Sequence, residues 1–243
     1  MFATAAALHD IEKRYKTFTL GPLTLTIPAG SIVGLVGENG AGKTTTLKLL
    51  TGVIRPSAGR AELLGGNPAD PATRARIGVV FEDAYFYENL TAAQVGRSMA
   101  GIFGARWQPE AFAGYLTHFG LDPRQKIKEY SRGMRMKLSL ATALAHAPEL
   151  LVLDEPTSGL DPVVRGEILD LFLDFIQDET RSILMSSHIT ADLEQVADSI
   201  AYLHKGRLLF QEDKDELLAE YGLLRCAQAD LAKLPDGAAI HTE

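Results

Sequence analysis

The sequence predicts an α/β fold built on a mainly parallel central sheet, with an N-terminal antiparallel β-subdomain and an inserted α-helical subdomain. Short, continuous apolar runs, typical of strands buried on both faces, alternate with segments whose apolar residues recur at helical spacing. A long stretch with helical patterns and no strand-like run interrupts this alternation and predicts the insertion. The four apolar runs are SIVGLV (31–36), IGVVF (77–81), LLVLD (150–154) and SILMSS (182–187).

The segment before Gly30 alternates apolar and polar residues, which predicts strands of an antiparallel sheet. Gly21 and Pro22 interrupt the alternation, and we expect the chain to turn there. Helices are expected at 44–52, after the first apolar run, and at 163–176, where apolar side chains recur on one face. The central sheet should therefore carry helices on both faces.

The insertion spans about residues 90–148 and contains three helical segments separated by glycine and proline. Further along, the chain reads IAYLHKGRLLFQ, which predicts a hairpin that turns at Lys205 and Gly206. We therefore divide the sequence into one domain over residues 1–212 and a short C-terminal extension over residues 213–243.

Composition limits the class of protein. A chain of 243 residues with 46% hydrophobic residues can bury a sizeable core. The net charge of −7 argues against nucleic-acid binding, which relies on clustered Lys and Arg. Cys226 is the only cysteine, so no internal disulfide can form, no thiolate metal cluster is expected, and a reducing compartment is favoured. We find no secretory signal and no apolar run near the ~20 residues of a membrane span, so we expect a soluble chain that would need another subunit to work at a membrane.

The strongest motif is GENGAGKTT, which matches the pattern GxxxxGK[ST] between a predicted strand and a predicted helix. Its glycines allow backbone amides to curl around a β-phosphate, Lys43 reaches the β and γ oxygens, and Thr44 can ligate Mg²⁺. The alternative is an ordinary glycine-rich turn; a dinucleotide fingerprint does not fit, because the spacing differs from GxGxxG. The expected phosphate-binding residues are Gly37, Glu38, Asn39, Gly40, Ala41, Gly42, Lys43, Thr44 and Thr45.

Polar side chains follow the third and fourth apolar runs. Asp154 and Glu155 come at the carboxyl end of a predicted strand, the edge where open α/β sheets bind ligands. We expect Asp154 to help hold the water shell of Mg²⁺ and Glu155 to orient and deprotonate the attacking water. Taken alone, such a pair would more often be carboxylates at a helix start. His188 is expected near a γ-phosphate, with a surface or packing histidine as the alternative.

A second predicted anion site lies far along the chain from Lys43. Ser131 is placed to cap a helix, and Gly133 leaves the backbone at the helix start open to close approach. A plain helix cap is the alternative. Asp161, followed by Pro162, likewise has the pattern of a helix N-cap.

Together and in this order, these motifs resemble the ATP-binding subunit of ATP-binding cassette (ABC) transporters, over about residues 8–211. The segment YSRGM stands where that family has its LSGGQ-like signature. The resemblance implies that two cassettes dimerise head to tail, so that Ser131 and Gly133 of one close over the ATP that is held by the phosphate loop of the other.

The resemblance also implies roles for single residues, with ATP and Mg²⁺ as cofactors. Tyr15 would stack on adenine, the alternative being a strand tyrosine packed on the sheet. Glu155 would be the catalytic base, His188 the γ-phosphate switch, and Lys43 the lysine that binds the phosphates. Asp161 would belong to a loop that crosses the dimer interface.

Three positions, one after the second apolar run and two in the signature, depart from the common pattern of the family. Glu82 stands where many members have glutamine, and the signature has Arg132 for glycine and Met134 for glutamine. A glutamate can still accept a hydrogen bond from magnesium-bound water, although it cannot donate one as an amide does. We therefore expect Glu82 at the metal, with Thr44 and Asp154.

These variants resemble the exporter-type branch that is related to bacitracin-resistance and sodium-extrusion ATPases. The resemblance implies the ATP-hydrolysing motor of an exporter, cytoplasmic and peripheral to the inner face of the cell membrane. Its partners would be a transmembrane permease on a separate chain and, when ATP is bound, a second cassette. An importer motor and a soluble single-cassette ATPase, as in iron–sulfur assembly, are the alternatives.

Overall fold

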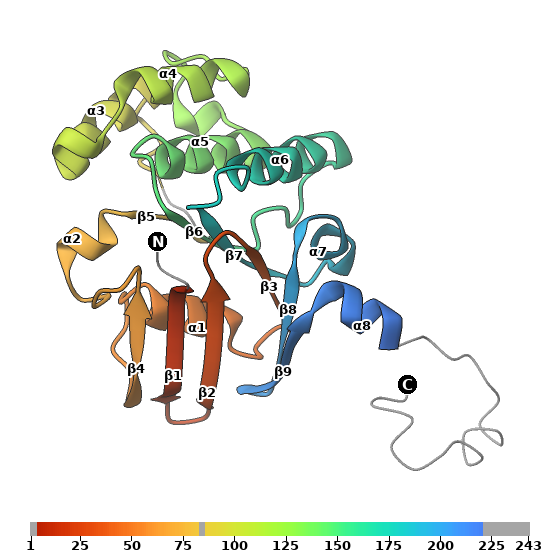
Figure 1. Cartoon of the computed structure of the whole chain (residues 1–243). Coiled ribbons are helices and arrows are strands. Elements are labelled where there is room, and N and C mark those ends of the chain that lie inside the picture. The colour runs from red at the N-terminus through yellow and green to blue at the C-terminus, as the bar shows by residue number, and fades with distance from the viewer. Residues whose placement is uncertain (1–3, 83–85, 221–243) are drawn as a thin grey trace, which may run out of the picture.

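The computed structural model describes residues 4–82 and 86–220, which form a large sheet, a smaller sheet and a set of helices (Figure 1). The large sheet has the strand order β5-β6-β7-β3-β8-β9, and its pairings are parallel except for that of β8 with β9. The prediction of a mainly parallel central sheet is confirmed. The four apolar runs form β3 (Ile32–Val36), β5 (Ile77–Val80), β6 (Leu150–Asp154) and β7 (Ser182–Ser187).

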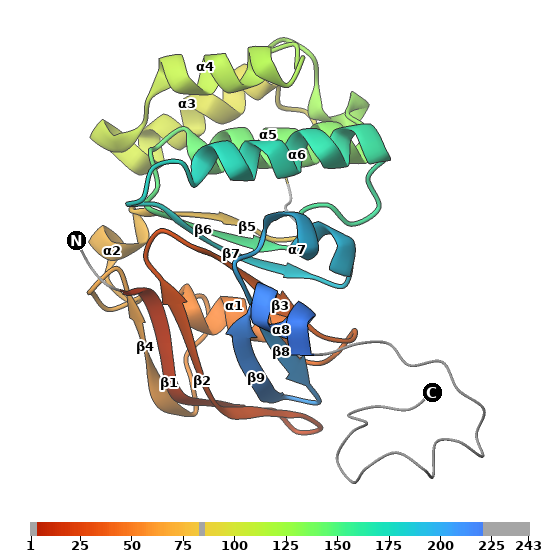
Figure 2. The ribbon, with the colours of Figure 1, turned by 45° about the vertical axis from the view of Figure 1, so that its right-hand side comes forward.

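The strands of the large sheet are apolar throughout because both faces of the sheet are buried. On β6, Leu151 and Leu153 belong to the core under helices α5 and α6, whereas Leu150 and Val152 belong to the core on the other face. Side chains alternate along a strand, so neighbouring apolar residues enter two different cores. Figure 2 shows α5 and α6 on one side of this sheet and α1 on the other. These helices are α1 (Lys43–Leu50), α5 (Arg132–Leu144) and α6 (Pro162–Phe175).

The smaller sheet is antiparallel, in the order β2-β1-β4. Gly21 and Pro22 lie inside β2, so the predicted turn at these residues is wrong. The chain turns instead between β1 and β2, where the Tyr15 N–H donates to the Phe18 carbonyl oxygen at 2.8 Å. Gly21 serves close packing: its φ is +91°, and a Cβ there would lie 2.1 Å from the Ile11 carbonyl oxygen. The strands are β1 (Thr4–Arg14), β2 (Thr19–Pro28) and β4 (Ala58–Leu63).

Helices α3, α4 and α5 fall within the predicted insertion at 90–148. Figures 1 and 2 show α3 and α4 on the side of α5 that faces away from the large sheet. Helix α3 begins with a capping box, in which Thr91 and Gln94 exchange side-chain and backbone hydrogen bonds. The remaining elements of this region are α3 (Ala92–Phe103), α4 (Pro109–His118) and the 3-10 turns Gly104–Arg106 and Ile127–Glu129.

The predicted hairpin near the end of the chain is confirmed. Lys205 and Gly206 have φ values of 46° and 81°, as a two-residue turn of the mirror-image type requires. Of the predicted extension, the structure describes α8, while Cys226 and the rest of residues 221–243 lie outside the described residues. The boundary at residue 212 stays a prediction. The elements not yet named are α2 (Pro71–Arg74), α7 (Thr190–Val196), β8 (Ser199–His204), β9 (Arg207–Asp213) and α8 (Lys214–Glu220).

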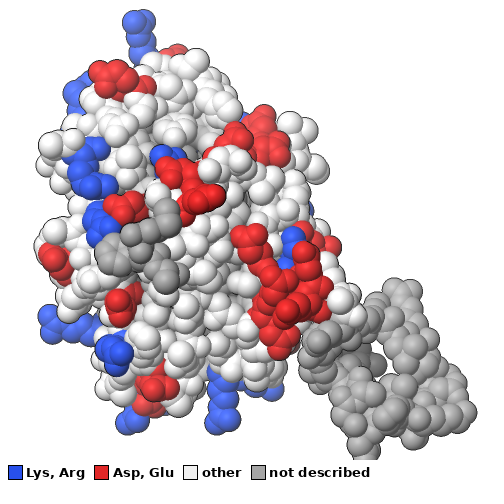
Figure 3. Space-filling view, viewed as in Figure 1, with Lys and Arg blue, Asp and Glu red and all other residues white. Residues whose placement is uncertain are grey.

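The surface is acidic around the C-terminal elements. Figure 3 shows Asp and Glu side chains gathered over the region of α8, whose first turn contains Asp215 and Glu216. Lys and Arg are spread over the rest of this face in small groups. Among residues 4–82 and 86–220, no helix combines the length and the apolar character that crossing a membrane demands.

Candidate nucleotide-binding site

The predicted phosphate loop connects β3 to α1 at the carboxyl end of the parallel strands. Gly42 has a φ of 112°, and a Cβ there would lie 2.6 Å from the Leu20 side chain. At Gly37 the obstacle is backbone, because a Cβ would lie 2.3 Å from the Leu203 carbonyl oxygen. The rest of the fold therefore holds the loop in its curled shape.

Lys43 joins this loop to the end of β6. Its side chain is only 7% exposed, its Nζ donates to the Gly37 carbonyl oxygen at 2.7 Å, and Nζ lies 3.3 Å from Glu155 Oε1. A buried ammonium needs such partners, because an unpaired charge away from water is costly. The cation that the motif supplies is thus held between the loop and the residue proposed as base.

Thr44 and Asp154 meet beside the loop. The Thr44 hydroxyl donates to Asp154 Oδ2 at 2.7 Å, and the Ser186 hydroxyl donates to Asp154 Oδ1 at 2.6 Å. Asp154 is 2% exposed, so these bonds fix its carboxylate. In the described part of the chain, no three His, Cys, Asp or Glu side chains gather into a metal site. The pair fits Mg²⁺, which is commonly held by one or two protein ligands together with substrate phosphates.

Glu155, the first residue after β6, has a φ of 50° and is 7% exposed. A non-glycine residue in this conformation is strained, and its backbone is held by donation of its N–H to the Ser186 carbonyl oxygen at 3.1 Å. His188 Nδ1 lies 2.7 Å from Glu155 Oε2. Oε1 is buried and accepts no hydrogen bond among the described residues; its one charged neighbour is the Lys43 ammonium at 3.3 Å. The carboxylate is therefore oriented by His188 at one oxygen and by the Lys43 ammonium at the other.

A cleft of ≈ 240 Å³ opens over the phosphate loop. Phe18, which the sequence analysis did not single out, lines it and packs against the place that a Gly42 side chain would take. Tyr15 does not line the cleft; it is 47% exposed, with Lys13 Nζ 5.7 Å from its ring centroid, and its predicted stacking on adenine stays a prediction. The described lining consists of Phe18, Glu38, Asn39, Gly40, Gly42, Lys43, Thr44, Thr45, Glu82 and Glu155.

The signature segment starts α5. The Ser131 side chain accepts from the Met134 N–H at 3.2 Å, so Ser131 is the N-cap. A Cβ at Gly133 would lie 3.5 Å from Val164, an ordinary contact, so packing within the chain does not require glycine there. A glycine in a helix costs roughly 0.5–1 kcal/mol relative to alanine.

Two of the three residues that depart from the family pattern, Arg132 and Glu82, contact each other. Arg132 Nη2 lies 3.3 Å from Glu82 Oε1, although fifty residues separate the two in sequence. The same guanidinium lies beside Gly159, where a Cβ would be 2.7 Å from Arg132 Nη1. Arg132 therefore links the helix start to the end of β5 and to the loop after β6.

Asp161 is the N-cap of α6. Its carboxylate accepts from the Val163 and Val164 N–H groups at 3.2 and 3.1 Å, and Pro162 takes the first helical position. The structure joins the phosphate loop, Asp154, Glu155 and His188 by direct contacts. It does not bring Ser131, Gly133 or Asp161 into the lining of the cleft.

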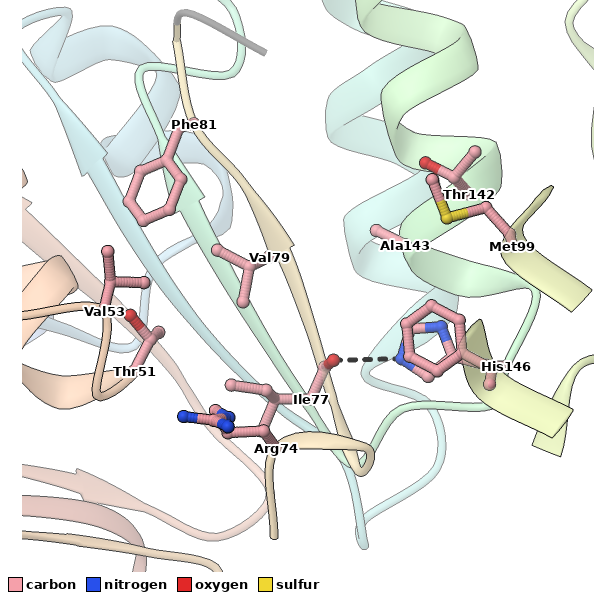
Figure 4. A pocket seen from close by; sticks show the side chains of 11 residues that line it. Thr51, Val53, Arg74, Ile77, Val79, Phe81, Met99, Thr142, Ala143 and His146 are labelled. Atoms are coloured by element: carbon pink, nitrogen blue, oxygen red, sulfur yellow. Dashed lines mark hydrogen bonds between the residues drawn. The ribbon is translucent and has the colours of Figure 1, made fainter. Parts of the chain in front are cut away.

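A second, more apolar groove of ≈ 390 Å³ lies between the large sheet and the helices. Figure 4 shows Val79 of β5 and Phe81, which follows the strand, on one side of the groove and Met99 and His146 on the other. His146 Nε2 donates to the Ile77 carbonyl oxygen at 2.9 Å, and burial lowers the pKa of this histidine. Phe81, which lines the groove, directly precedes Glu82 in the sequence, so this side of the groove lies next to Glu82.

Comparison with known proteins shows the family of the chain. A family model described as "ABC transporter" matches residues 20–158. The chain belongs to the ABC transporter family. It is 37% identical over 220 residues to the bacitracin transport ATP-binding protein BcrA of Bacillus licheniformis, covering 88% of this chain and 72% of that protein. The predicted resemblance to an ATP-binding ATPase subunit of the bacitracin-resistance branch is confirmed.

Other relatives of this ABC protein agree. It is 39% identical over 230 residues to an ABC transporter ATP-binding protein of Synechocystis, covering 89% of this chain, but it spans only 65% of the length of that relative. A solved ATP-binding subunit of an ABC transporter superposes with a TM-score of 0.79 at 28% identity, covering 95% of this chain and 98% of that one. The predicted fold class is therefore confirmed.

Proposed function

We propose that this ABC protein is the ATP-hydrolysing motor of an exporter, that it works as a head-to-tail pair with Mg²⁺, and that it drives a transmembrane permease on a separate chain. The observation that carries the catalytic part is the placement of Glu155, which contacts both Lys43 and His188 beside the Thr44–Asp154 pair. The chemistry follows from the position of each group.

Glu155 acts as the base. His188 holds Oε2, and Oε1 faces only the Lys43 ammonium, so Oε1 would accept a proton from water once Lys43 turns to the phosphate oxygens. As the water oxygen bonds to the γ-phosphorus, the bond from that phosphorus to the β–γ bridging oxygen breaks, and the water proton passes to Glu155. Lys43, 3.3 Å from Glu155, is placed to offset charge on the phosphate oxygens that the loop holds.

Thr44 and Asp154 would hold Mg²⁺, and Glu82, which lines the same cleft, would accept from a magnesium-bound water. Held there, Mg²⁺ would supply positive charge that offsets the negative charge of the ATP phosphates. The nucleobase would extend toward the β1–β2 turn, where Phe18 lines the cleft and Tyr15 offers an exposed ring.

Gly133 supports the pairing of two copies. Packing within the chain does not require a glycine at this position, since an alanine side chain would make only ordinary contact with Val164. Ser131 beside it is exposed at the start of a 13-residue helix, where amides and the helix dipole favour an anion. We infer that the phosphates of an ATP bound to a second copy approach this helix start, with Asp161 in the adjoining interface.

The apolar groove supports the membrane partner. Val53, Phe81 and Met99 line a surface that joins the large sheet to the helical region, and Val53 is 58% exposed. A short amphipathic segment of a permease fits such a groove, because its apolar face would cover these side chains. Docking there would place the chain at the inner face of the membrane and next to Glu82.

Replacement of Glu155 by glutamine tests the proposal. Glu155→Gln keeps the shape of the side chain and removes the base, so hydrolysis should fall by roughly 10²–10⁴-fold while ATP still binds. Because ATP is then not consumed, the variant should shift from monomer to dimer on a sizing column when ATP is added. Glu62→Gln, the same change at an exposed position of β4, is the matched control and should behave as the native protein.

The shared site has its own test. Ser131→Arg should block closure over the ATP of a second copy, so mixing it with native protein should lower the activity per native subunit. Undiminished specific activity in the mixture would contradict head-to-tail pairing. Normal hydrolysis by Glu155→Gln, together with a monomeric elution, would remove the proposed base.

A further inference from the structure

Asp192, on α7, is a buried carboxylate that the catalytic scheme does not use. It is 1% exposed, and each of its oxygens has a partner. Oδ2 accepts from the Thr157 hydroxyl at 2.5 Å, and Oδ1 accepts from Arg165 Nε. Thr157 is also buried, at 1% exposure, whereas the Arg165 side chain reaches the surface with 30% of its area.

These three residues belong to three segments that carry site residues. Thr157 lies two positions after Glu155, Arg165 four positions after Asp161, and Asp192 four positions after His188. The contact between Thr157 and Asp192 therefore runs beside the contact between Glu155 and His188, and it joins the same two loops. Arg165 adds the first turns of α6 to this link.

A charged group at this position needs an explanation, because burial of an ion pair costs solvation that its Coulomb attraction only partly returns. Apolar residues of similar volume could fill the same space. What the ionic group adds is geometry: a carboxylate accepts from Thr157 and Arg165 in fixed directions, and it would be left with unsatisfied oxygens if either loop moved.

We propose that Asp192 is a positioning residue, which sets the distance between the loop after β6 and the turn that carries His188, and thereby the approach of His188 to Glu155. The proposal rests on the roles proposed above for Glu155 and His188. Asp192 itself does not line the cleft and touches no proposed reacting group.

Thr157→Val, which keeps the shape and removes the hydroxyl, tests this role. We expect kcat for ATP hydrolysis to fall by ~10-fold or more, since a displacement of ~1 Å can cost ~100-fold. The dissociation constant for ATP should stay within twofold, because Lys43 and the phosphate loop are untouched. Thr157→Ser restores the donor and should restore kcat. Asp192→Asn should also lower kcat, because Arg165 loses its charged partner.

Ser182→Ala is the matched control. Ser182 is fully buried at the other end of β7, where its hydroxyl accepts from the Gly30 N–H at 3.1 Å. It should lose stability much as Thr157→Val does, yet keep its kcat. Amide hydrogen exchange of the nucleotide-free protein gives a readout independent of activity: Thr157→Val should speed exchange in both 155–161 and 188–192, and Ser182→Ala in neither.

The outcomes separate the two proposals. If Glu155→Gln abolishes hydrolysis but Thr157→Val keeps its kcat and its exchange rates, the positioning role of Asp192 is refuted and the proposed function stands. A loss of stability in Thr157→Val with kcat unchanged per folded molecule also refutes it. If Glu155→Gln hydrolyses ATP normally, the proposed function fails, whatever the exchange data show.

Discussion

Glutamine replacements at Glu82 and Arg132, singly and together, are expected to show a coupling of about 0.2–1 kcal/mol in the stability of the nucleotide-free protein. The two charges lie 3.3 Å apart on side chains that are 47% and 56% exposed. Coulomb's law gives ~1.3 kcal/mol at that distance in bulk water. Ordering two exposed side chains reduces this to the range stated. Glutamine removes each charge but keeps side-chain length and helix propensity.

The same pair predicts an effect on ATP. Glu82 lines the cleft while its Oε1 is paired with Arg132, so under the proposed function Arg132 and a magnesium-bound water would compete for one carboxylate. Arg132→Gln removes that competition, and affinity for Mg·ATP should rise by about 1.4- to 5-fold, the equivalent of the coupling. The gain should vanish when Glu82 is already glutamine. It should also vanish near 1 M salt, where the Debye length is only about 3 Å.

Arg135 and Glu88 provide the matched control. Their charges lie 3.7 Å apart, with 41% and 53% of the side chains exposed, and they join the same helix to the same connecting segment. Glu88 does not line the cleft. Glutamine replacements there should show a similar coupling in urea unfolding and no change in Mg·ATP affinity by calorimetry. Equal affinity gains in both pairs, or none for Arg132→Gln, would refute the reasoning.

Three further outcomes are expected. Gly133→Ala should stabilise the chain by roughly 0.5–1 kcal/mol in thermal unfolding while weakening the ATP-dependent dimer on a sizing column; an unchanged dimer would contradict the approach of phosphates there. Phe18→Ala should weaken ATP binding by ~1–3 kcal/mol but spare tripolyphosphate, and Tyr15→Ala, titrated in the same way, shows which ring contacts the base. Burial lowers the pKa of His146 below 6.5, so the unfolded chain takes up a proton first. Stability is then full above pH ~6.5 and declines below it by at most ~1.4 kcal/mol per pH unit until the folded pKa is passed; His146→Gln should flatten that slope in urea unfolding.

The central sheet could be predicted because its strands are buried on both faces and leave continuous apolar runs. The turn assigned to Gly21 and Pro22 was wrong for a tertiary reason. Glycine is needed there so that β2 can approach the Ile11 carbonyl oxygen on the neighbouring strand. In the sequence, a glycine required for such close packing looks the same as a glycine required for a turn. The sequence alone shows that a glycine stands at position 21, but only the contact with the neighbouring strand shows why it is needed.

Some residues of the candidate site could likewise be predicted from the sequence, and others could not. The phosphate loop and the Asp154–Glu155 pair follow strands, so their convergence at one edge could be predicted from the pattern. Phe18 could not, because one aromatic residue beside a turn does not differ from a packing residue until the cleft above the loop is seen. The pairing of Glu82 with Arg132 also joins residues fifty positions apart, which no local spacing relates.

The charges of the cleft bear on why two copies would be needed. Among the described residues, a single chain lines the cleft with one ammonium, that of Lys43, and with the carboxylates of Glu38, Glu82 and Glu155. The loop amides and Lys43 suit the β-phosphate, but the wall formed by Glu155 would repel a γ-phosphate that lacked other partners. A lysine at the helix start of a second copy could pair with these carboxylates without nucleotide and hold the dimer closed. In the proposed pair, Ser131 and Gly133 would supply amides and a dipole instead, and the neighbouring Arg132 is bound to Glu82 of its own chain. Closure would then depend on the phosphates themselves, which is what a motor driven by ATP requires.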